Sequence, residues 1–275
     1  MLPYLDLPKL GPITSFGILA SIGMYCAIAA ATRHAQRLGI DPKLVSRMAL
    51  YCGVGTILGA HYVDLFFYQP GWSDQPDAFW RFVNPNAGIS SYGGILGATL
   101  GFLLFARKHD QRLRLGDVAA VGGLVMLTLG RAGCASVHDH VGVASDFALA
   151  VDFPAGNPAG VVGPHHDLGL YEFAMLAVLL GVSLILLRTP RRPGWFVGFL
   201  AVTYPVPRFL LETLRREGPD PRYFGLTPAQ WGCIATFAAG LAILAVVHRR
   251  GDAPPAYRDV TPRRLVNRAP ARRSR

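Results

Sequence analysis

Apolar residues in this chain fall into runs of about 20 residues with few charged side chains, as at 168–187 and 228–247. A helix of about 20 residues crosses the roughly 30 Å hydrocarbon core of a membrane. Only 16% of the 275 residues are charged, against about 25% in a typical soluble domain. The pattern argues against a soluble enzyme and predicts an all-α polytopic membrane protein. Seven transmembrane helices are expected, at 13–32, 48–68, 90–106, 115–133, 168–187, 194–212 and 228–247.

Positive charge is concentrated on one side of this seven-helix topology. Of the 27 lysines and arginines, 20 lie in the segments 33–47, 107–114, 188–192 and 249–275. The positive-inside rule places that side in the cytoplasm, so the N-terminus is expected outside and the C-terminus inside. The net charge of +10 is then a topology signal and attracts anionic lipid headgroups. No nucleic-acid partner is needed to explain it.

The domain organisation is simple. Residues 1–250 are expected to form one seven-helix transmembrane domain, because no soluble domain boundary or repeat interrupts them. Residues 251–275, with two adjacent prolines and many arginines, are expected to form a basic, flexible cytoplasmic tail.

Charged residues inside the sixth predicted span form the first candidate site. Tyr204, Arg208 and Glu212 recur at helical spacing and therefore share one face. Arg208 and Glu212 can also form an i,i+4 ion pair. Pro205 and Pro207 interrupt this helix, and broken helices at membrane depth line cavities. A ligand site is therefore favoured, although a purely structural ion pair also fits the pattern.

A second candidate site lies at the outer end of the fourth predicted span. Arg131 has no acidic residue beside it in the sequence, and a guanidinium at this depth suits bidentate capture of a lipid phosphate. An arginine that extends to the interface is the alternative. In the third predicted span, the stripe Gly93, Gly97 and Gly101 predicts close helix packing. Tyr92 beside it is either a site residue or an interfacial aromatic.

Histidines crowd the loop that follows Arg131. This loop and its exit offer the ligand types that bind zinc or another transition metal, namely Cys134, His138, His140, His165 and His166. Their spacing fits no zinc template, so a polar lining without metal is the preferred interpretation. No cofactor is predicted.

Taken in order, these segments resemble the prolipoprotein diacylglyceryl transferases. Residues 130–142 match the frame of the family signature Gly-Arg-x-Gly-Asn-Phe-x-Asn-x-Glu-x-x-Gly, and 93–97 match His-Gly-Gly-Leu-Ile-Gly after its first position. Arg208 and Glu212 match Arg-Phe-x-x-Glu, and 170–172 match the end of His-Pro-x-Gln-Leu-Tyr-Glu. The resemblance runs from about residue 12 to residue 248.

This sequence departs from the family pattern at several positions. Phe16, before Gly17, stands at the position of the tyrosine in the first-span motif Trp-Tyr-Gly. Tyr92 replaces the family histidine before Gly-Gly, which is implicated in proton transfer. Cys134, Val137 and Asp139 stand at the positions of the two asparagines and the glutamate of the signature. The arginines and the closing glycine are retained.

The resemblance implies transfer of the diacylglyceryl group from phosphatidylglycerol to the lipobox cysteine of a prelipoprotein, in the bacterial inner membrane. Arg131 and Arg208 would stabilise the leaving phosphate, and Glu212 would orient Arg208. The proton acceptor would be Tyr92 or, more suitably near neutral pH, His138 or His140. The expected substrate-binding residues are Gly93, Gly94, Arg131, Gly133, Gly142, Tyr204 and Arg208.

Two other functions are compatible with the residues alone. A metal-dependent membrane hydrolase would use the histidine-rich loop to activate water. A non-catalytic lipid-binding or transport homologue would bind the headgroup without turnover.

The charge asymmetry yields a first testable prediction. Cysteines introduced into the loop 134–167 should react with membrane-impermeant thiol reagents added from outside, whereas cysteines in the tail 251–275 should not. Labelling of the tail from outside would contradict this topology and place every candidate site residue in the wrong compartment.

Overall fold

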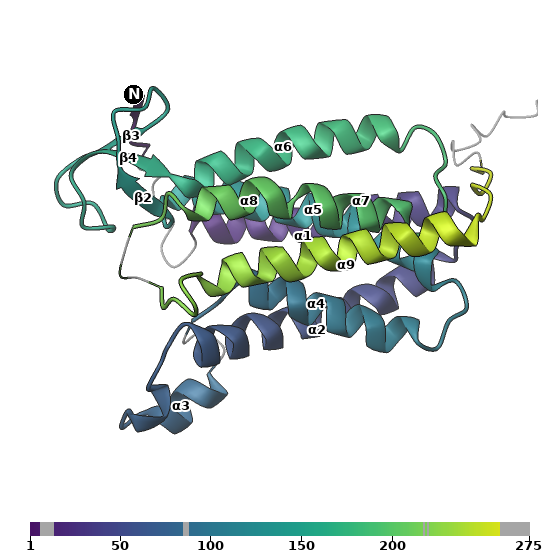
Figure 1. Cartoon of the computed structure of the whole chain (residues 1–275), viewed down its shortest axis with the longest axis horizontal. Coiled ribbons are helices and arrows are strands. Elements are labelled where there is room, and N and C mark those ends of the chain that lie inside the picture. The colour runs from purple at the N-terminus through teal and green to yellow at the C-terminus, as the bar shows by residue number, and fades with distance from the viewer. Residues whose placement is uncertain (6–13, 85–87, 217, 219, 259–275) are drawn as a thin grey trace, which may run out of the picture.

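A computed structural model of the chain describes residues 1–5, 14–84, 88–216, 218 and 220–258. Long helices form a bundle, and a small β-sheet and a short helix project from one end of it (Figure 1). The helices are α1 (Ser15–Arg37), α2 (Pro42–Phe67), η1 (Trp72–Asp74), α3 (Ala78–Val83), α4 (Ser91–Ala106), α5 (Arg112–Val137), α6 (Leu168–Leu186), α7 (Trp195–Thr203), α8 (Pro205–Glu212) and α9 (Pro228–Arg250).

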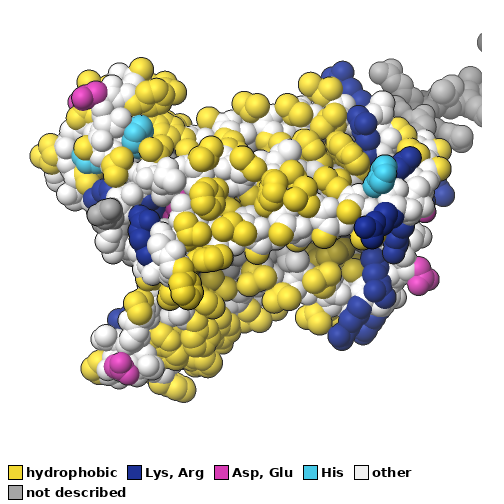
Figure 2. All heavy atoms as spheres, viewed as in Figure 1, with side chains coloured by type: hydrophobic (Ala, Val, Ile, Leu, Met, Phe, Trp, Pro, Cys, Tyr) yellow, Lys and Arg dark blue, Asp and Glu magenta, His cyan; other side chains and the backbone are white. Residues whose placement is uncertain are grey.

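Five described helices are long and apolar enough to cross a membrane: α1, α2, α5, α6 and α9. The third predicted span corresponds to α4, an apolar helix of 16 residues. The sixth corresponds to α7 and α8, which are separated at Tyr204. Hydrophobic side chains cover the flank of the bundle in Figure 2, and lysines and arginines gather at the end opposite the sheet. This distribution fits the charge asymmetry of the sequence.

Glycines allow α2 and α4 to pack closely. A Cβ atom added at Gly55 would overlap the carbonyl oxygen of Gly97, and one added at Gly59 would overlap that of Gly93. Gly101 meets the backbone of α2 in the same way. The predicted packing role of the small-residue stripe is therefore confirmed.

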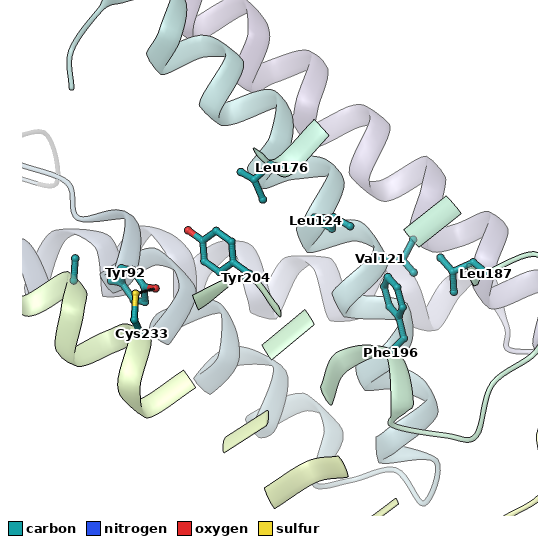
Figure 3. Packing of buried hydrophobic residues seen from close by; sticks show 9 residues of the cluster. Tyr92, Val121, Leu124, Leu176, Leu187, Phe196, Tyr204 and Cys233 are labelled. Atoms are coloured by element: carbon teal, nitrogen blue, oxygen red, sulfur yellow. Dashed lines mark hydrogen bonds between the residues drawn. The ribbon is translucent and has the colours of Figure 1, made fainter. Parts of the chain in front are cut away.

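A buried hydrophobic cluster joins α4 to the helices of the second half of the chain. Its members include Tyr92, Leu176, Phe196, Tyr204 and Cys233 (Figure 3). Two of its members, Tyr92 and Tyr204, carry hydroxyl groups, so polar contacts reach into the cluster.

The prediction of an all-α protein is wrong for the segment that follows α5. Four short strands, β1 (Leu2–Pro3), β2 (Val141–Ala144), β3 (Val151–Phe153) and β4 (Gly163–Asp167), form a sheet in the order β1-β3-β4-β2. Pair β1–β3 is parallel, and the other two pairs are antiparallel. Apolar side chains of this segment bury one another in a small core of Val141, Val151, Phe153 and Val161.

The first part of the predicted tail contacts the bundle. The backbone N–H of Arg258 donates to the carbonyl of Arg37 over 2.8 Å, and the Arg37 guanidinium lies 4.1 Å from the centre of the Tyr257 ring. The remainder of the predicted tail, 259–275, lies outside the described residues.

The glycine contact between α2 and α4 yields a prediction with a matched control in the same helix. Gly55→Ala should lower the thermal midpoint of the detergent-solubilised protein, because overpacking costs about 1–3 kcal/mol. Gly53→Ala should leave it nearly unchanged, because a Cβ there meets no atom of another described element within 4 Å. Equal midpoints for the two variants would contradict the close approach.

Candidate active site

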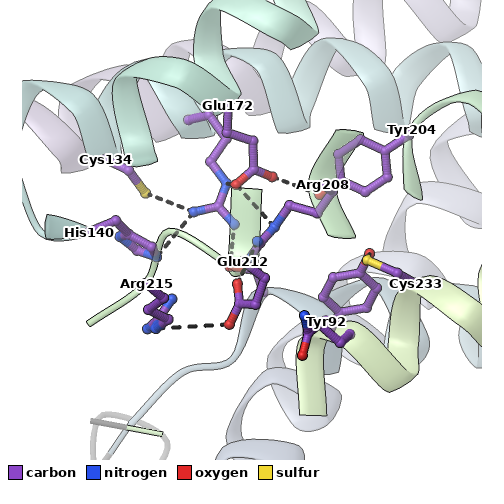
Figure 4. Close-up of polar contacts among 12 residues, drawn as sticks. Tyr92, Cys134, His140, Glu172, Tyr204, Arg208, Glu212, Arg215 and Cys233 are labelled. Atoms are coloured by element: carbon purple, nitrogen blue, oxygen red, sulfur yellow. Dashed lines mark hydrogen bonds and ion pairs between the residues drawn. The ribbon is translucent and has the colours of Figure 1, made fainter. Parts of the chain in front are cut away.

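Two buried arginines from different helices meet at one carboxylate oxygen. Arg131 of α5 places Nε 3.0 Å from Oε2 of Glu172 in α6, and Arg208 of α8 places Nε 3.2 Å from the same oxygen. The three side chains are at most 6% exposed. Figure 4 shows the Arg208 side chain beside Glu172. The arrangement brings two positive charges to a single anionic oxygen.

The predicted face of the sixth span contributes most of the remaining contacts. Arg208 donates from Nη1 to Glu212 over 2.6 Å, and Tyr204 donates its hydroxyl to Glu172 over 2.7 Å. Thr227, the N-cap of α9, donates to the second oxygen of Glu212 over 3.2 Å. Tyr204, Arg208 and Glu212 thus share one face, as the helical spacing predicts.

The break between α7 and α8 has a local cause. Pro205 and Pro207 lack backbone N–H groups, so the carbonyls one turn earlier lose their helical donors. The two helices are separated at Tyr204, whose side chain is buried beside the charged residues.

Arg131 is held by three further contacts near the C-terminal end of α5. Its Nη2 donates to Ser91 of α4 over 2.9 Å. Its Nη1 lies 3.2 Å from Nε2 of His140 and 3.8 Å from the sulfur of Cys134. A guanidinium can only donate, so His140 accepts at Nε2 and carries its proton at Nδ1. That Nδ1 lies 2.5 Å from the carboxylate of Asp139.

Arg215 extends the network toward the surface. Nε of Arg215 lies 2.5 Å from Asp220 and 3.9 Å from Glu212. Burial raises the pKa of the Asp220 carboxyl, and the neighbouring Arg215 opposes that rise only in part. With Arg131, Arg208 and Glu172, the network therefore sets three guanidinium groups against three carboxyl groups.

His138 lies apart from this network. It ends α5 with a left-handed backbone φ of 51°, and its Nδ1 is 2.5 Å from the carboxylate of Asp167. The ring of Tyr4 stacks on it with centroids 4.5 Å apart.

Residues 5–246 match the family model of the prolipoprotein diacylglyceryl transferases. The chain belongs to this family. A relative from Chromohalobacter salexigens is 32% identical over 90% of this chain and 93% of its own length. A relative from Methylocella silvestris is 30% identical over 82% of this chain and 84% of its own length. A relative from Pseudomonas aeruginosa is 29% identical over 87% of this chain and 91% of its own length.

All three relatives carry the name phosphatidylglycerol–prolipoprotein diacylglyceryl transferase. Family membership and the apolar helices together identify this prolipoprotein diacylglyceryl transferase family member as a multi-pass membrane protein.

Tyr92 does not contact the arginines through its hydroxyl. That oxygen lies 2.7 Å from the sulfur of Cys233 in α9. The ring fills space that Gly232 leaves open, because a Cβ atom there would overlap it.

The predicted substrate-binding glycines occupy close contacts between elements. Gly93 faces Gly59, Gly133 faces Phe16, and Gly142 faces the carbonyl of Leu214. Gly94 lies beside Thr56. These contacts explain the glycines by packing and leave their substrate-binding role a prediction.

The predicted metal ligands do not converge as a set. Cys134 and His140 do come together with Asp139, with one ligand atom of each within 4.8 Å of the others. However, His138 pairs with Asp167, and His165 and His166 have partners on β4 and α6. The Arg131 guanidinium next to Cys134 and His140 places positive charge where a cation would bind, which disfavours metal here.

The list of candidate residues drawn from the sequence omits two residues that hold this site together, Ser91 and Glu172. Glu172 is the one acidic residue in the apolar run 168–187, and a charge within a predicted span is a signal that could have identified it. The sequence offers no comparable signal for Ser91.

The shared carboxylate yields a prediction on stability. Glu172→Gln should destabilise the protein by about 3–5 kcal/mol, because it leaves the buried Arg131 guanidinium without a carboxylate partner and leaves Arg208 with Glu212 alone. Asp77→Asn removes the partner of Arg81 in an exposed pair and should cost less than about 1 kcal/mol. Thermal unfolding in detergent measures both, and similar midpoints for the two variants would refute a central role for Glu172.

Proposed function

We propose that the protein transfers the diacylglyceryl group of phosphatidylglycerol to the lipobox cysteine of a prelipoprotein in the bacterial inner membrane. The family match across residues 5–246 supports this function. The observation that carries it is the convergence of Arg131 and Arg208 on one carboxylate oxygen.

The proposed orientation has seven spans, with the N-terminus outside and the C-terminus in the cytoplasm. Helix α4 would be the third span, and α7 with α8 would be the sixth. The belt of lysines and arginines at the end away from the sheet supports this orientation (Figure 2). The charged network and the sheet would then face the outer side, where exported proteins are modified.

The arginines would act on the phosphate of the lipid donor. When the carbon–oxygen bond between diacylglycerol and phosphate breaks, the electron pair stays on the phosphate oxygen. Two guanidinium groups that already share an anionic oxygen can stabilise this growing charge, and fixed donors in a water-poor site are especially effective. Glu172 and Glu212 would hold Arg131 and Arg208 in place, and Tyr204 would fix Glu172 in turn.

The acceptor thiol must lose a proton before or while its sulfur attacks carbon. A tyrosine hydroxyl ordinarily has a pKa of about 10 and seldom accepts protons near neutral pH. Imidazole groups exchange protons in that range. His138 and His140 are therefore better suited to this role than Tyr92.

Complementation tests the function directly. A bacterial host depleted of its own transferase should grow when it expresses this chain, and its lipoproteins should carry diacylglyceryl groups. Headgroup binding without complementation would favour a non-catalytic lipid-binding homologue. Loss of activity on chelation would favour the metal-dependent hydrolase.

Arg208→Lys tests whether Arg208 binds the phosphate of the lipid donor. Lysine keeps the charge but lacks the planar fork of donors, so transfer should fall by about 100-fold. The amount of protein in the membrane should stay normal. Full transfer activity in Arg208→Lys would leave Arg208 with only a structural ion-pair role.

A further inference from the structure

A cavity of about 760 Å³ lies at the sheet end of the molecule, beside the charged network. Its volume falls within the range of pockets that enclose organic ligands. Its walls include apolar and hydroxyl side chains from the start of α1 and the end of α5, and also Ile89, His138, Asp139 and Arg216. None of the arginines that pair with Glu172 lines it.

Among the described residues that line this cavity, His138 alone carries an imidazole, and its two nitrogens differ. A carboxylate only accepts hydrogen bonds, so contact with Asp167 requires the proton on Nδ1 and leaves a lone pair on Nε2. Among the described residues, nothing hydrogen-bonds to that buried Nε2. Leaving a buried polar atom unpaired is costly, so this ring in the cavity wall calls for a polar partner from a ligand.

The imidazole is also held rigidly. Asp167 is fully buried and caps α6 by accepting from the backbone N–H of Leu170 over 2.9 Å. Tyr4 stacks on one part of the ring, and Phe153 meets it edge-on with centroids 5.7 Å apart. Asp167 therefore sets both the tautomer and the orientation of His138.

The other two proton-acceptor candidates lack a free lone pair in this position. Nε2 of His140 is taken by the Arg131 guanidinium. The Tyr92 hydroxyl lies against Cys233 in the helical core.

The cavity is connected to the proposed phosphate-binding network by a chain of contacts. Asp139 lines the cavity and contacts His140, which contacts Arg131. A group bound in the cavity is thus next to the residues assigned to the phosphate.

We propose that this cavity receives the cysteine-bearing segment of the acceptor protein, with the thiol at Nε2 of His138. This inference rests on the proposed function. Nε2 takes the thiol proton as the sulfur forms its bond to the diacylglyceryl carbon, and the carbon–oxygen bond to phosphate breaks. Glycerol phosphate leaves with the electron pair, and the imidazolium returns its proton to that phosphate or to water. Asp167 is a positioning residue.

The chemistry of the walls favours a peptide over a lipid headgroup. The Asp139 carboxylate in the wall repels a phosphate, whereas apolar and hydroxyl groups suit small peptide side chains. Nε of Arg216 is buried without a partner among the described residues, and an arginine N–H can donate to a peptide carbonyl.

The first test uses His138→Gly, because glycine accepts the left-handed backbone of this position. Transfer to a synthetic signal-peptide substrate with one cysteine should fall by about 100-fold. Exogenous imidazole should restore at least a tenth of the wild-type rate. Arg208→Lys is the control, since imidazole should not restore its activity. Asp167→Asn keeps the helix cap but presents an N–H to Nδ1, so it should lower kcat without changing the KM for phosphatidylglycerol.

The second test fills the cavity. Ala159→Trp places a large side chain in the cavity wall and should raise the KM for the peptide at least tenfold. The KM for phosphatidylglycerol should stay constant. Ala155→Trp lies in the same loop but outside the cavity lining and should change neither constant.

Each outcome decides the inference. A fully active His138→Gly variant, or one that stays inactive in imidazole while its thermal midpoint is normal, would overturn the role of His138. A raised KM for phosphatidylglycerol in Ala159→Trp would assign the cavity to the lipid headgroup instead. If the wild-type protein itself transfers no lipid, the proposed function fails, and this result is distinct from failure of the variants alone.

Discussion

The structure depends on a few charged side chains that are buried among otherwise apolar helices. A charged side chain in the hydrocarbon region is costly unless it is paired, and Glu172 pairs with two arginines at once. Because Arg131, Glu172 and Arg208 come from α5, α6 and α8, the same contacts that neutralise the charges also fix three helices relative to one another. Stability and the geometry of the site therefore arise from one set of bonds.

Close helix packing supplies the rest of that geometry. The glycine contact between α2 and α4 determines where the start of α4 lies, and Ser91 at that start accepts from Arg131. On the other side, the break at Tyr204 lets α8 begin beside α6, so that the Tyr204 hydroxyl and Arg208 both reach Glu172. Close helix packing and the helix break at Tyr204 thus decide where the guanidinium groups meet.

Short-range patterns in the sequence predicted those features that depend on residues close together in the chain. Runs of apolar residues indicated the helices, the spacing of Tyr204, Arg208 and Glu212 indicated their common face, and the glycine stripe indicated close packing. The sheet was missed because its strands have two to five residues, too few for a period of two to emerge. The role of Glu172 was missed because its arginine partners lie 36 and 41 positions away in the sequence, on two other helices.

The direction of hydrogen bonds explains why two histidines so near in sequence differ in chemistry. The partner of His140 at Nε2 is a guanidinium, which only donates hydrogen bonds. The lone pair of His140 is therefore occupied, because it accepts from Arg131. The partner of His138 at Nδ1 is a carboxylate, which only accepts, and this leaves the opposite nitrogen of His138 with an unused lone pair. Composition alone treats the two residues as equivalent members of a histidine-rich loop. Their neighbours in space assign one to holding Arg131 and leave the other able to accept a proton, so a substitution of Tyr for His at position 92 need not remove proton transfer from the site.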